Sequence, residues 1–148
     1  MIIMVLHLFA ALVWVGGMFF AYTFLRPAAV EKLEPPERLE LWSSVFRRFF
    51  PWVWLSVLAL PSSGIWLVGE LYGDLASSPV TVKAMTTLGP IMGALFAIVF
   101  FFPYRHLKTH VANKDYPAAG KNLATIRKII GFNLILGLTV MTLAGLSR

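Results

Sequence analysis

Four long runs of apolar residues constrain this chain more than any other feature of its sequence. They cover residues 2–25, 49–69, 84–104 and 129–146, and each is close to the roughly 20 residues that a helix needs to cross a bilayer. A segment inside lipid must satisfy its own backbone polar groups, which favours helices for runs of this length. The sequence therefore predicts an all-α integral membrane protein, a four-transmembrane-helix bundle that forms a single domain over residues 1–148.

Composition agrees with a protein that is solvated mainly by lipid. Hydrophobic residues make up 58% of the chain and charged residues only 14%, whereas a soluble domain carries about a quarter of charged residues. Cysteine is absent, which excludes disulfides and thiolate metal sites. The first apolar run is too long for the core of a signal peptide and follows no charged residue, so we expect it to be a retained helix.

Basic residues are concentrated in two of the three connections. Of the 13 lysines and arginines, eleven lie between the first and second runs or between the third and fourth, and only Lys83 and Arg148 lie on the other side. The positive-inside rule places the two basic connections in the cytoplasm. We therefore expect an N-out, C-out, multi-pass protein of the bacterial inner membrane. The net charge of +6 reflects this topology rather than nucleic-acid binding.

Short segments of the chain carry further expectations. Pro35 and Pro36 can start an amphipathic helix in the first connection, whose apolar residues would lie on the membrane interface: Leu39, Leu41, Trp42 and Val45. Gly89 and Gly93 form a small-xxx-small pair that would let another backbone approach the third helix. Bulky aromatic residues in the cytoplasmic half favour a closed apolar plug there.

His7 is the only histidine inside an apolar run. At helical spacing from it lie Trp14 and Gly17, so that one helix face reads imidazole, aromatic, small. Such a face could admit a flat cofactor beside a ligand nitrogen. Ionisable residues inside membranes are costly and usually functional, so we interpret His7 as a ligand or redox residue. The alternative is a histidine that is hydrogen-bonded to a neighbouring helix.

Several residues fall at the same outer depth as His7 in this topology. Met4 shares its helix face, and a thioether with an imidazole suits Cu(I) where cysteine is absent. Met85 and Met92 descend from the outer end of the third helix, where Lys83 could ligate a metal, pair with a propionate or anchor the helix at the interface. Methionines also fill cores with no metal. We expect the site in the outer half of the membrane.

Other candidates lie at the cytoplasmic side. His106 and His110 are four residues apart, which puts both imidazoles on one helix face. They are either solvated interfacial residues or a second metal or haem contact. Arg47 and Arg48 are either topology anchors or partners for the carboxylates of a porphyrin or quinol.

The first helix resembles that of the copper-resistance protein D domain family. In that family a histidine is followed seven residues later by tryptophan and then by two glycines, as His7, Trp14, Gly16 and Gly17 are here. The segments 25–28 (Leu-Arg-Pro-Ala) and 46–49 (Phe-Arg-Arg-Phe) are similar too.

The chain is also similar to the related membrane-bound, oxygen-independent protoporphyrinogen oxidase family. The shared features are the same histidine-to-tryptophan spacing, an arginine pair before Pro51, and Val82-Lys83 at the start of the third helix. In that family the first-helix histidine and the third-helix lysine are implicated in binding haem b. The resemblance therefore implies that His7 and Lys83 have this role. It is also compatible with an oxidoreductase activity.

The preferred hypothesis is a haem b-binding redox protein with His7 as axial ligand and with Trp14, Gly17, Lys83, Met85 and Met92 near the cofactor. The alternatives are a copper import or transport protein that uses His7 and Met4, and a cofactor-free membrane subunit. We assign no catalytic residue. The expected partners are the bilayer and a porphyrin, a quinone or copper as ligand, and a homo-oligomer is compatible with this bundle.

Overall fold

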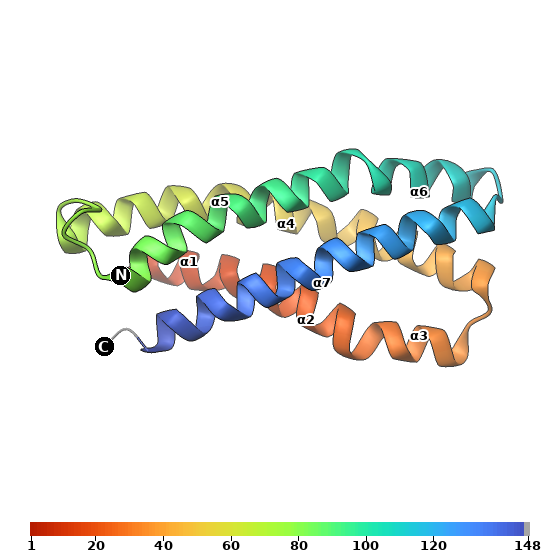
Figure 1. The fold of residues 1–148 in the computed structure, drawn as a ribbon, viewed down its shortest axis with the longest axis horizontal. Helices are drawn as coiled ribbons and strands as arrows, with labels where there is room; N and C mark the ends of the chain where they lie inside the picture. Colours follow the sequence, from red (N-terminus) through yellow and green to blue (C-terminus); the bar gives the residue numbers. More distant parts are fainter. Residues whose placement is uncertain (147–148) are drawn as a thin grey trace.

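Residues 1–146, which the computed structural model of the protein describes, form four long helical arms (Figure 1). The first arm comprises α1 (Ile2–Ala11), η1 (Leu12–Gly16), α2 (Gly17–Phe20), η2 (Ala21–Leu25) and α3 (Arg26–Lys32). The others are α4 (Pro35–Tyr72), α5 (Val80–Phe101) with α6 (Pro103–Ala112), and α7 (Tyr116–Leu146). All four arms are long and apolar enough to cross a membrane. The all-α, four-helix membrane fold is thereby confirmed, while Arg148 lies outside the described residues.

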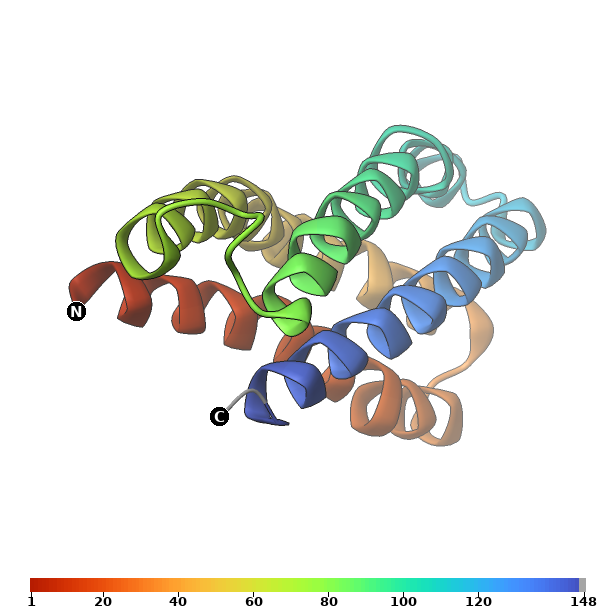
Figure 2. The same cartoon turned by 60° about the vertical axis from the view of Figure 1, so that its left-hand side comes forward.

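Each arm packs against its sequence neighbours, and α7 also packs against α4 and the first arm. Helix α1 packs on α4, α4 on α5, α5 on α7, and α7 on η1 and α2 of the first arm. Figures 1 and 2 show both chain ends at one end of the bundle, together with the connection between α4 and α5. We call this the terminal end. The turns between α3 and α4 and between α6 and α7 lie at the other end, the basic end.

The first arm runs continuously, but two of its turns are wider than an α-helix. The η1 and η2 segments are π-helical, with the looser turn that often marks irregular packing or a functional site. Trp14 and Val15 of η1 are buried against the other arms. The wider turn therefore lies where the first arm meets the core.

Aromatic side chains fill the core toward the basic end. Phe46 stacks on Phe50 with ring centroids 4.9 Å apart, and the Phe50 ring meets the edges of Phe96 and Tyr104 at 5.2 and 4.7 Å. The prediction of an aromatic plug is correct only in part, because Phe50 is buried in this core while several other aromatic residues of that half are exposed, among them Phe20 and Phe102. It missed a cavity of about 310 Å³ that lies beside the core at the same end.

The segment that starts at Pro35 is not a separate interfacial helix. It is the first part of α4, which continues through Pro51 and Pro61 to Tyr72. Leu39 and Trp42 are buried in the core instead of lying on the membrane interface. The expectation was wrong because no turn separates this segment from the second apolar run.

Close helix contacts use other glycines than the predicted pair. A Cβ atom on Gly89 would meet nothing within 4 Å, and one on Gly93 would lie 3.5 Å from Val57. The tight positions are Gly17, where a Cβ atom would clash with the Phe49 ring of α4, Gly131, where Tyr22 lies 3.0 Å from such an atom, and Gly137, where Val15 lies at 2.9 Å. Gly17 of the first arm and two glycines of α7, rather than the pair on α5, therefore allow close approach.

Candidate functional site

His7 lies on α1, half-buried against α4 near the terminal end. Its Nδ1 atom is 2.8 Å from the Ser63 hydroxyl oxygen. The next residue of α4 is Gly64, and a Cβ atom there would lie 3.5 Å from the His7 Cε1 atom. The small residue lets the imidazole edge approach the α4 backbone closely.

The hydrogen bonds of Ser63 determine which nitrogen of His7 carries the proton. The Ser63 hydroxyl donates to the carbonyl of Ala59, one turn earlier in α4, with a longer contact to the Leu60 carbonyl. Since its proton is used there, its oxygen is left as an acceptor for His7, which favours the tautomer with the proton on Nδ1. The Nε2 atom then keeps its lone pair, as a metal ligand requires.

The methionines and Lys83 lie in different environments. Met4 lies one turn before His7 on α1 and is 38% exposed. Met92 is buried, with its methyl group 3.2 Å from where a Cβ atom of Gly137 would lie. Met85 is partly buried on α5, and the exposed Lys83 donates to the carbonyl of Ala76 at 2.7 Å. Lys83 therefore pins the connection before α5, while His7 is bonded to α4.

Trp14 and Gly17 lie in the protein core. Trp14 is 3% exposed and meets the edge of Phe96 with centroids 6.4 Å apart. The Phe49 ring lies so close over Gly17 that a Cβ atom there would clash with it. The space that these residues were expected to offer to a cofactor ring is filled by Phe49.

The candidates at the basic end do not converge on one point. His106 is exposed on α6, and the Nδ1 atom of His110 lies 3.3 Å from a carboxylate oxygen of Asp115. Arg47 and Arg48 are exposed on α4. Within residues 1–146, no group of three or more His, Cys, Asp or Glu side chains is placed to hold a metal ion.

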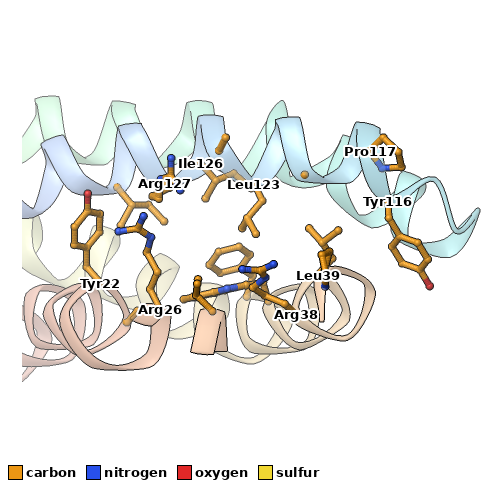
Figure 3. Close-up of a pocket in the computed structure, with 17 residues that line it drawn as sticks. Tyr22, Arg26, Arg38, Leu39, Tyr116, Pro117, Leu123, Ile126 and Arg127 are labelled. Atoms are coloured by element: carbon orange, nitrogen blue, oxygen red, sulfur yellow. The ribbon is translucent and has the colours of Figure 1, made fainter. Parts of the chain in front are cut away.

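Two features of the structure were not predicted from the sequence. One is Ser63 as the partner of His7, for which the polar segment 62–64 inside an apolar run was the only signal. The other is the cavity at the basic end, which α3, α4 and α7 enclose (Figure 3). Its arginines come from two different connections, and their convergence depends on how the arms cross.

Comparison with known proteins gives one match. A family model described as copper resistance protein D matches residues 43–147. No curated protein and no solved structure matches the chain. The matched region begins in α4 and covers the following arms, so that His7 and the rest of the first arm lie outside it. The match supports a copper-related membrane function, and it gives no support to haem b or to a relation with protoporphyrinogen oxidases.

Proposed function

This chain belongs to the copper resistance protein D family, and we propose that it moves copper across the membrane, with His7 as a ligand near the terminal end. The ion is the cargo of the protein. The proposal includes import from the outer side of a bacterial inner membrane, because the basic end is the cytoplasmic end under the positive-inside rule.

The proposal rests mainly on the Nε2 atom of His7. The hydrogen bond from Nδ1 to Ser63 leaves Nε2 with a free lone pair and holds the ring against α4. A hydrogen bond from the other ring nitrogen orients a histidine ligand and raises its basicity. The imidazole therefore needs no change of tautomer before it binds a metal ion through Nε2.

The surrounding residues suit a soft ion that is held by few ligands. Met4 is one turn away on the same helix, and imidazole with thioether is a donor set for Cu(I). A transported ion must bind well enough to enter and weakly enough to leave. A site of low coordination meets this requirement better than a closed cage would, and Met85 and Met92 are candidates for later positions along the path.

Haem b fits the first arm less well than copper does. The Phe49 ring fills the space over Gly17, and Trp14 is packed against Phe96. We derive no redox step from a porphyrin at this position. A cofactor-free subunit is the remaining alternative, and the experiment below separates all three.

The test compares copper uptake by cells that express the parent chain, His7→Ala or His106→Ala at equal membrane levels. We expect His7→Ala to lose most of the uptake, because the only histidine of the apolar runs is removed. His106→Ala, which removes an exposed histidine at the basic end, should keep it. Equal uptake in all three would contradict the proposal. A purified parent protein with a Soret band that His7→Ala abolishes would establish haem instead.

A further inference from the structure

The cavity at the basic end has the size and position of a binding site. Its volume of about 310 Å³ is at the lower end of the range for ligand pockets. Its walls come from the end of the first arm (residues 21–30), the start of α4 (35–46) and the start of α7 (116–130). Most of the lining is apolar, and aromatic side chains of the core close its inner side.

Three arginines line this apolar space without an acidic partner, and of these Arg127 is exposed. Arg26 and Arg38 are half-buried and extend toward α7, while Arg127 comes from α7 itself (Figure 3). None of the 17 lining residues is acidic. Within residues 1–146, no ion pair involves any of the three arginines. The Arg26 guanidinium lies over the Tyr22 ring, 5.5 Å from its centroid.

Two glutamates of the neighbouring segment are bonded to other groups, and Glu34 and Glu37 are exposed and form no ion pair with these arginines among the described residues. The hydroxyl of Tyr116 donates to Glu40 at 3.0 Å, and this bond raises the pKa of the Tyr116 phenol. The carboxylate of Glu31 lies 2.7 Å from the ammonium group of Lys32. Among the described residues, no salt bridge therefore neutralises the positive charge of the cavity.

The sequence positions of Arg26 and Arg127 place these two arginines near the depth of phospholipid phosphates. Arg26 directly follows the first apolar run, and Arg127 stands two residues before the fourth. These positions lie at the boundary between hydrocarbon and headgroups. Guanidinium groups form paired hydrogen bonds with phosphate oxygens, and basic pockets between helices on the cytoplasmic side bind anionic headgroups.

We propose that this cavity binds one anionic phospholipid. Its phosphate lies among Arg26, Arg38 and Arg127, and part of an acyl chain lies along the apolar wall beside Val30 and Ile130. The lipid would join the first arm, α4 and α7 at the end of the bundle where, among the described residues, no salt bridge links these arms and the Tyr116–Glu40 hydrogen bond joins only α7 and α4. This proposal does not depend on copper transport.

The test measures the thermal stability of the detergent-purified protein with added lipid. Phosphatidylglycerol should raise the Tm, whereas phosphatidylcholine and inorganic phosphate should not, and a native mass spectrum should show one bound phospholipid. The double variant Arg26→Gln/Arg38→Gln should lose most of this shift. The matched control is Arg47→Gln/Arg48→Gln, which removes the same charge from exposed positions at the same end and should keep the shift.

A second variant distinguishes loss of the lipid site from misfolding of the Arg26→Gln/Arg38→Gln protein. Gly120 lines the cavity on α7, and a Cβ atom there meets nothing within 4 Å. Gly120→Leu should fill the space and lose the lipid shift while all charges are kept. Equal shifts in both arginine double variants would overturn the proposal, as would stabilisation by inorganic phosphate alone or a coloured porphyrin in place of the lipid.

Discussion

Ser62 and Ser63 are neighbours with nearly the same local bonding and different long-range contacts. Each hydroxyl donates to the carbonyl four residues earlier in α4. Only Ser63 also meets His7, while Ser62 is exposed. Serine in a helix commonly bonds back to its own turn, so the sequence could not tell which of the two would also contact the first arm. His7 itself could be recognised, because it is the only histidine inside an apolar run.

This pair of serines gives a matched test of how His7 is positioned. In Ser63→Ala the Nδ1 proton loses its acceptor, and the ring is free to change tautomer or rotate. Loss of the residue that hydrogen-bonds a metal-ligating histidine typically weakens metal binding by about 10- to 100-fold. We expect Ser63→Ala to weaken Cu(I) binding by a factor in this range, as measured by competition with a Cu(I) chelator. Ser62→Ala should bind as the parent does, and equal effects of both changes would contradict the role of Ser63.

At the scale of the elements, α7 packs closely on the first arm because two of its contact residues are glycines. Gly131 faces Tyr22, and Gly137 faces Val15 and Met92. In lipid, where water does not drive helices together, such close approach supplies much of the packing energy. The sequence pointed to Gly89 and Gly93 because they are four residues apart, but spacing alone does not show which helix face meets a neighbour.

The contact at Gly137 predicts that one added methyl group lowers the stability of the protein at this position. In Gly137→Ala the new Cβ atom would lie 2.9 Å from the stiff, β-branched side chain of Val15, so the helices must move apart. We expect a loss of about 1–3 kcal/mol, the usual cost of overpacking. The measurement is equilibrium unfolding in mixed detergent.

The control for this change lies on the same helix. Gly120→Ala adds the same methyl group where nothing lies within 4 Å. It should be neutral or should stabilise by up to about 1 kcal/mol, because alanine favours the helix. A Gly137→Ala protein that is as stable as Gly120→Ala would show that the two helices can separate here without cost.

The start of α4 shows which element boundaries a sequence can predict. Pro35 and Pro36 correctly indicated a helix start, since proline is well suited to the first turn. No glycine, proline, asparagine or aspartate follows before the second apolar run, and Arg47-Arg48 are charged without breaking a helix. The helix therefore continues, and its first turns join the core.

At the scale of the whole molecule, the number of helices could be predicted because lipid allows few alternatives. Four apolar runs of spanning length leave little choice of fold. The cavity could not be predicted, because it forms where residues 21–30, 35–46 and 116–130 meet. Where three separate segments converge depends on crossing angles and on side-chain packing, such as Phe49 over Gly17. Hydropathy alone predicts neither the crossing angles nor the side-chain packing.

The orientation of the bundle is the last prediction, and charge determines it. Both chain ends lie at the terminal end (Figure 1), and eleven of the 13 basic residues belong to the connections at the basic end. The positive-inside rule places those connections in the cytoplasm. A reporter that is active only in the cytoplasm should therefore work when inserted at Lys114, and one that is active only outside should work at the C-terminus. Activity of the same reporter at both sites would contradict the four-helix count. Exchanged activities would reverse the orientation and place His7 on the cytoplasmic side, where it could not accept copper arriving from outside.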